Sequence, residues 1–210
     1  GDGFVVYGEP TNVLVGGYRI ASYVCPSDPQ DEILDMGTRG NGGRILWWKT
    51  NAGGVADSYS AWESSQLYDI PIRNGDGMML NRKAIQISDV KDGTSNTLFV
   101  GEVTGNFPGT PVSGAWGGWS WTWAHSGAFT TYFGINGPGT IPGDGNYDPM
   151  LNDGFSSYHP GGCHFLMVDG SVQYISQNTN ASLLTALTTR NGTQYYSTGT
   201  PDQVLVSGPP

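Results

Sequence analysis

The stretch HPGGCHFLMVDGSVQYIS, residues 159–176, predicts a β-hairpin that turns at Asp169-Gly170. Asp-Gly favours a two-residue hairpin turn, because both central positions need positive φ, which glycine adopts freely. A turn of that length pairs Met167 with Val172. Side chains alternate along a strand, so one face of the hairpin collects Cys163, Phe165, Met167, Val172 and Tyr174. We expect that face to belong to the hydrophobic core.

The composition indicates a single β-rich domain of extracellular character over residues 1–210. Only 13% of the residues are charged, whereas glycine totals 33 and tryptophan 7. The formal net charge is −9, and an acidic chain without a basic cluster argues against binding to nucleic acid or to an anionic membrane. No stretch approaches the roughly 20 apolar residues of a membrane span. We expect a motif-bearing core over about residues 20–190 and a tail over 191–210.

Outside the hairpin, the apolar runs predict a mostly β fold of the α+β class. Residues 97–103, TLFVGEV, form a strong strand whose Glu102 either faces solvent or is a paired buried charge. Residues 31–43 and 51–60 are turn-rich and are expected to be loops. Residues 180–192 form the one convincing helix. Its apolar stripe consists of Leu183, Leu184 and Leu187. We therefore expect an antiparallel sheet with long Gly-rich loops and one short C-terminal helix.

The chain has two cysteines, Cys25 and Cys163. Neither belongs to a Cys-x-x-Cys pair, which argues against a zinc site. An even count in a chain of extracellular character favours one disulfide between them. The alternative is two buried free thiols, and the spacing of the cysteines does not decide between these states.

The segment WGGWSWTW, residues 116–123, concentrates tryptophan. If it is extended, its alternate indoles share one face of a strand. Such a row can stack on sugar rings or form a subunit contact, although large aromatic residues more often belong to a core. The candidate ligand or subunit contacts are Trp116, Trp119, Trp121 and Trp123.

A second candidate site lies in the long loop over residues 134–154, where oxygen ligands occupy alternate positions. Asp144, Asn146 and Asp148 suit calcium, a hard cation that takes several oxygen ligands. The match to the EF-hand loop is incomplete, because its sixth-place Gly and twelfth-place Glu are missing. The alternative interpretation is an ordinary turn rich in Asp and Asn.

Four motifs in fixed order resemble those of a large family of secreted, pseudopilin-like bacterial proteins of unknown function, abundant in planctomycete-type genomes. The motifs are YVCPSDP (23–29), ISDVKDGTSNTL (87–98) followed by Gly101-Glu102, HPGG (159–162) and DGSV (169–172). The nine-residue gap between His159 and Asp169-Gly170 is the H-x9-DG spacing of the family's prepilin-type processing-associated C-terminal module. One motif alone would be weak evidence, but four in order are specific.

The resemblance implies a β-rich globular head that follows a prepilin peptidase site and one long hydrophobic helix. The sequence contains neither of these leading features, so we expect the head domain alone. Heads of this kind often bind calcium in a C-terminal loop, and no catalytic residues are established for the family. The motif positions are therefore interpreted as structural; they are Glu102, His159, Gly161, Gly162, Asp169 and Gly170.

The leading functional hypothesis is a non-enzymatic structural subunit, located outside the cell or on its surface. It would assemble with copies of itself, or join a pilus-like filament or secretion apparatus. A second hypothesis is a module that binds glycans or small solutes through the Trp-rich segment. A third is a hydrolase that uses His159 or His164 with Glu102 or Asp169. Histidines beside Pro-Gly-Gly more often brace a loop, which places the enzyme last.

Overall fold

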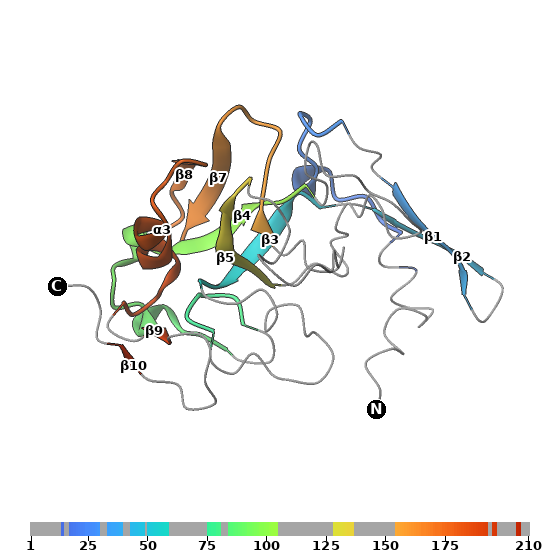
Figure 1. Cartoon of the computed structure of the whole chain (residues 1–210). Helices are drawn as coiled ribbons and strands as arrows, with labels where there is room; N and C mark the ends of the chain where they lie inside the picture. Colours follow the sequence, from blue (N-terminus) through green and yellow to red (C-terminus); the bar gives the residue numbers. More distant parts are fainter. Residues whose placement is uncertain are drawn as a thin grey trace, which may run out of the picture.

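The computed structural model shows a mostly β protein, in which the short helix α3 lies on the sheet (Figure 1). It describes residues 14, 17–29, 33–39, 43–48, 50–58, 75–80, 84–104, 128–136, 154–192, 195–196 and 205–206. The elements in chain order are η2 (Ala21–Tyr23), β1 (Ile33–Arg39), β2 (Gly43–Trp48), β3 (Ala52–Asp57), η3 (Ile87–Asp89), η4 (Thr94–Asn96), β4 (Leu98–Glu102), β5 (Ala128–Ile135), β6 (Gly154–Phe155), β7 (Gly162–Met167), β8 (Val172–Ser176), α3 (Ala181–Thr188), β9 (Tyr195–Tyr196) and β10 (Leu205–Val206). The expected class, mostly β with one short C-terminal helix, is confirmed. None of the described helices is long and apolar enough to cross a membrane.

Within the described part of the chain, the main sheet has six strands in the order β6-β5-β3-β4-β7-β8. Strands β3, β4, β7 and β8 pair antiparallel, whereas β5 is parallel to both β3 and β6. The sheet is thus mixed: the expected antiparallel pairing holds for β3, β4, β7 and β8, whereas β5 departs from it through its two parallel pairings. Long connections precede β5 and β6, and only such connections let a strand return parallel to its neighbour. Separate two-stranded ribbons are formed by β1 with β2 and by β9 with β10.

Strands β7 and β8 form the predicted hairpin, but its register differs by one residue from the prediction. His164 pairs with Tyr174, and Leu166 pairs with Val172. Because side chains alternate, a shift of one residue moves every side chain of one strand to the opposite face. Val172 and Tyr174, expected in the core, are instead 64% and 46% exposed. Ile175 takes the inward position on β8 and is 9% exposed.

The turn explains this shift. Gly170 donates its N–H to the carbonyl of Met167 at 3.0 Å, and Met167 donates to the carbonyl of Ser171 at 2.8 Å. Gly170 has a φ of 89°, and Asp169 is not among the positive-φ residues of the described chain. A three-residue loop with glycine in the left-handed region therefore replaces the predicted two-residue turn. Asp169 contributes through its side chain, which accepts the N–H of Ser171 at 2.8 Å.

The inner face of the sheet carries an aromatic core. The ring of Phe155 lies 5.9 Å from that of Phe129 and 5.0 Å from that of Phe165, centroid to centroid. Helix α3 covers this face with Leu184, which is 3% exposed, while Leu183 is 55% exposed. Only part of the predicted leucine stripe therefore packs against the core.

The central strand β3 was predicted to be a loop, and that prediction was wrong. Its sequence, AGGVAD, lacks the run of β-branched and aromatic residues that marks a strand. Gly53 has a packing role instead, because a Cβ on it would overlap the ring of Phe129. Residues 31–43 were also predicted to be a loop, but most of them form β1. In both cases pairing with other strands overrode weak local preference.

Candidate functional site

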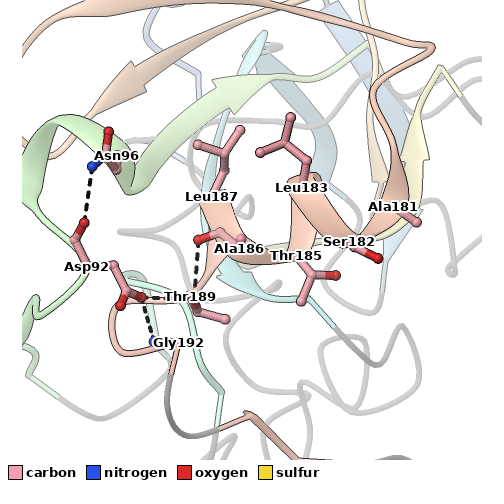
Figure 2. A pocket seen from close by; sticks show the side chains of 10 residues that line it. All are labelled: Asp92, Asn96, Ala181, Ser182, Leu183, Thr185, Ala186, Leu187, Thr189 and Gly192. Atoms are coloured by element: carbon pink, nitrogen blue, oxygen red, sulfur yellow. Dashed lines mark hydrogen bonds between the residues drawn. The ribbon is translucent and has the colours of Figure 1, made fainter. Parts of the chain in front are cut away.

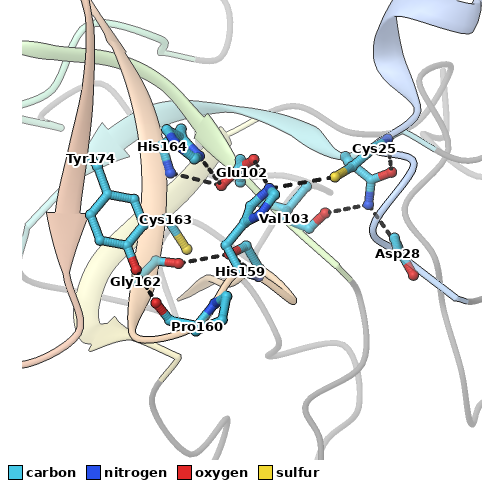
Figure 3. Close-up of polar contacts among 12 residues, drawn as sticks. Cys25, Asp28, Glu102, Val103, His159, Pro160, Gly162, Cys163, His164 and Tyr174 are labelled. Carbon is cyan, nitrogen blue, oxygen red and sulfur yellow. Dashed lines mark hydrogen bonds and ion pairs between the residues drawn. The ribbon is translucent and has the colours of Figure 1, made fainter.

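Glu102, the last residue of β4, lies between two histidines (Figure 3). Pairing of Gly101 with Phe165 puts Glu102 opposite His164 on the neighbouring strand. Its Oε2 accepts the backbone N–H of His164 at 2.7 Å and lies 3.2 Å from Nδ1 of the same residue. Its Oε1 lies 3.1 Å from Nε2 of His159. Of the two roles considered for this carboxylate, the structure therefore supports the paired one.

The loop that leads into β7 holds His159 in place. Ser157 Oγ accepts the His159 N–H at 3.1 Å and donates to the carbonyl of Gly162 at 2.7 Å. From the other strand of the hairpin, the Tyr174 hydroxyl donates to the carbonyl of Pro160. These bonds fasten the backbone of the His-Pro-Gly-Gly motif to the hairpin that follows it, and so fix the position from which the His159 side chain extends.

Asn51, directly before β3, brings the Cys-Pro-Ser-Asp loop to this place. Its Oδ1 accepts the N–H of Cys25 at 2.8 Å, and its Nδ2 donates to Asp28 Oδ2 at 2.6 Å and to the carbonyl of Val103 at 2.9 Å. The Val103 N–H returns to the carbonyl of Asn51 at 3.0 Å. One buried amide therefore fastens the cysteine loop to the end of β4.

The result is a cluster of Cys25, Glu102 and His159, in which one ligand atom of each lies within 4.8 Å of the others. Cys25 Sγ is 3.6 Å from the same His159 Nε2 that faces Glu102. The side chains of His159 and Glu102 are 28% and 21% exposed, so solvent reaches the cluster. The ring of His164 meets that of His159 edge-on, with 5.0 Å between centroids.

The geometry of the cluster does not match a nucleophile–base–acid relay. In such a relay the nucleophile meets one ring nitrogen of the histidine and the orienting carboxylate meets the other. Here Cys25 Sγ and Glu102 Oε1 both face Nε2 of His159. The hydrolase hypothesis combined His159 or His164 with Glu102 or Asp169. Glu102 does contact both histidines. Asp169 instead lies in the hairpin turn, where it bonds to Ser171 and Thr94.

The expected disulfide between Cys25 and Cys163 was wrong, because both thiols are free. Strand β7 directs Cys163 into the core, on the face opposite to His164. Its Sγ lies 3.9 Å from Asn136 Oδ1, whereas Cys25 Sγ faces His159. Burial, and to a lesser degree the Glu102 carboxylate, raises the pKa of Cys163 to about 12. The two cysteines therefore have separate environments.

The remaining motif residues form a second group around the end of α3 (Figure 2). Asp92 Oδ2 accepts from Thr189 Oγ1 at 3.0 Å and from the Gly192 N–H at 2.6 Å. The Asp169 N–H donates to the carbonyl of Thr94 at 3.1 Å, which joins the hairpin turn to the same segment. Hydrogen bonds from the Ser171 hydroxyl, and to a lesser extent from the Ser171 N–H, lower the pKa of the exposed Asp169 carboxyl. This group holds the helix and the hairpin turn to η4.

Two predicted sites lie outside the described residues. They are the calcium ligands Asp144, Asn146 and Asp148 and the tryptophans Trp116, Trp119, Trp121 and Trp123. Gly161 and Gly170, in contrast, have positive φ values of 85° and 89°, and a Cβ on Gly162 would overlap the carbonyl of Ile175. The proximity of Cys25 to His159 could not be predicted from local sequence, because 134 positions separate the two residues.

The fold and the cluster together define a mostly β domain with a Cys-Glu-His group where β4 ends and β7 begins. The chain belongs to the bacterial family described as "Protein of unknown function (DUF1559)", which matches residues 5–182. No curated protein and no solved structure matches the chain.

Proposed function

We propose that this domain is a non-enzymatic structural subunit, located outside the cell or on its surface, that assembles with copies of itself through the β8 edge of its sheet. The observation that carries the proposal is the exposure of β8, the last strand of the sheet in the described part of the chain. Val172 and Tyr174 on this strand are 64% and 46% exposed. The low content of charged residues and the resemblance to pseudopilin-like heads support the extracellular location.

The backbone of β8 supports pairing with another strand. The carbonyl of Ser171 accepts from β7, and the N–H of Gln177 donates to Gly161, directly before β7. Between them, the N–H and C=O groups of successive residues point alternately toward β7 and away from it. This alternation directs the groups of Val172 and Tyr174 away from β7. Natural sheet edges are usually protected from such pairing by charged residues or proline, and the sequence of β8, VQYIS, contains neither. A second copy could therefore add a strand here.

The geometry of the Cys25, His159 and Glu102 cluster supports the non-enzymatic part of the proposal, because both possible partners share one ring nitrogen. An acid–base relay would need both nitrogens of His159 engaged in different roles. The cluster instead connects three segments that are distant in sequence.

The test is sedimentation velocity of the protein with its native flanking segments over a range of concentrations. We expect concentration-dependent association, which Val172→Lys weakens at least about tenfold, because a charge at a sheet edge opposes strand addition. The matched control is Ile87→Lys, since Ile87 is 67% exposed but lies on η3 outside the sheet. A wild-type protein that stays monomeric at every attainable concentration, or equal effects of the two substitutions, would contradict the proposal.

A further inference from the structure

We propose that Cys25, His159 and Glu102 bind a divalent transition-metal ion of the zinc class. The inference begins with His159 Nε2, which faces Cys25 Sγ at 3.6 Å and Glu102 Oε1 at 3.1 Å. For a tetrahedral zinc ion, the usual bond lengths place a sulfur and a nitrogen ligand ~3.6 Å apart and a nitrogen and an oxygen ligand ~3.4 Å apart. Two of the three spacings thus resemble those between ligands of one ion, and the third pair, Cys25 Sγ and Glu102 Oε1, lies within 4.8 Å.

The carboxylate of Glu102 is oriented for this role. Its Oε2 is occupied by the N–H of His164 at 2.7 Å and by Nδ1 of the same residue at 3.2 Å. That leaves Oε1 directed at His159 Nε2 and available to the ion. Carboxylates that bind metals are commonly held by such outer hydrogen bonds, which fix their orientation. His164 is therefore a positioning residue rather than a ligand in this arrangement.

Hydrogen bonds within the chain hold the segments that carry the three ligands. Asn51 fastens Cys25 to the end of β4, and Ser157 fastens His159 to the start of β7. Glu102 belongs to a paired strand. A preformed site reduces the ordering that binding would otherwise require. The partial exposure of His159 and Glu102, 28% and 21%, leaves the ion a path from solvent.

The ligand set selects the class of ion. Thiolate and imidazole ligands suit zinc and its neighbours, whereas calcium and magnesium prefer oxygen ligands alone. Three protein ligands leave a fourth position for water or for a group supplied from outside. The lack of a Cys-x-x-Cys pair argues against a zinc site built from neighbouring cysteines, but a site can also combine one cysteine with ligands from distant segments.

An ion here would join the Cys-Pro-Ser-Asp loop to the sheet. The expected disulfide would have made a similar connection through Cys163. Binding to the folded chain alone would stabilise it, because a ligand that binds only the native state shifts the folding equilibrium. The proposal does not depend on self-association, since every atom involved belongs to one chain.

The decisive experiment is a titration of the untagged, reduced protein with Co²⁺, which reports a thiolate ligand through charge-transfer absorption. We expect saturation at one ion per chain, and loss of the absorption when Zn²⁺ is added in competition. Cys25→Ala should abolish the band. Cys163→Ala is the matched control and should retain it, because that thiol points into the core. A band that survives Cys25→Ala, or the absence of saturable binding, would overturn the proposal.

A second measurement guards against variants that fail for structural reasons. Without metal, the Tm of each variant reports its folding, and the rise of Tm on addition of Zn²⁺ reports binding. We expect that rise in the wild type and in Cys163→Ala but not in Cys25→Ala or His159→Ala. His164→Ala should fold and bind about 10–100-fold more weakly, as outer-shell substitutions usually do. Should His164→Ala bind as tightly as the wild type, the orienting role of His164 would be wrong, whereas an equal rise of Tm in Cys25→Ala would overturn the site itself.

Discussion

The two faces of strands β4 and β7 differ in chemistry although they share one backbone. On the inner face, Leu98, Phe165 and Met167 are fully buried. On the outer face, Glu102 and His164 are 21% and 44% exposed and bond to one another. Successive side chains of β7 point to opposite faces, and a register shift between Leu98 and Val100 of β4 places Leu98 and Glu102 on opposite faces as well. The buried core and the polar contacts therefore occupy different faces of the same two strands. We therefore expect substitutions one residue apart on these strands to affect either the stability of the fold or the polar contacts of the outer face, but not both.

The largest expected effect comes from removing an inner-face ring. Phe165→Ala should lower the free energy of unfolding by about 3–5 kcal/mol, because it leaves a cavity beside Phe155 in the aromatic core. Urea unfolding at neutral pH measures the change. The control on the outer side is Leu166→Ala, where partial exposure predicts a smaller loss. Similar losses at the two positions would contradict the division between faces.

A second substitution tests how tightly the inner face is packed. A Cβ on Gly101 would overlap the rings of Phe165 and Phe155. We expect Gly101→Ala to destabilise the fold by about 1–3 kcal/mol, because rings in a filled core must leave their preferred positions. Combining it with Phe165→Leu should recover part of the loss relative to the sum of the single substitutions. Strict additivity in urea unfolding would argue against direct overlap.

The Cys163 thiol sharpens the comparison through pH. Its folded pKa is raised from an ordinary value of 9.0 to about 12, so the folded state retains a proton that the unfolded state loses. The contribution to stability is fully present below pH 9 and is lost as the pH rises toward 12, by about 1.4 kcal/mol per pH unit. Unfolding free energies from pH 8 to 11 should converge between the wild type and Cys163→Ala. Parallel curves would show that burial of the thiol has no such effect.

The smallest effect on stability is expected on the outer face. His164→Ala removes a contact to Glu102 from a side chain that is 44% exposed, and exposed ion pairs contribute only about 0–1 kcal/mol. Thermal unfolding in the presence of a metal chelator provides the measurement. A loss of stability as large as that caused by Phe165→Ala would mean that contacts on the outer face also stabilise the fold.

The elements that sequence predicted well are those whose causes are local. The β7–β8 hairpin follows from alternating apolar residues and a turn glycine, and α3 follows from its Asn180 cap, whose side chain accepts the Ser182 N–H at 2.8 Å. The register was missed by one residue because two turn types fit Asp-Gly, and they place Tyr174 on opposite faces. Strand β3 was missed because its Gly53 is explained only by the ring of Phe129 in another segment.

The residues of the candidate site were likewise predictable from local sequence, but most of the contacts among them were not. Sequence alone identified Glu102, His159 and Cys25 as motif residues, and its third hypothesis set His159 or His164 with either Glu102 or Asp169. It assigned Cys25 to the wrong partner, because the choice between Cys163 and His159 depends on which face of β7 each occupies. Local patterns thus determined the β7–β8 hairpin, strand β4, the helix and the motif residues, but not β1 or β3. Tertiary structure alone decided the register, the mixed sheet and the joining of Cys25, Glu102 and His159, because those features depend on contacts between segments far apart in the chain.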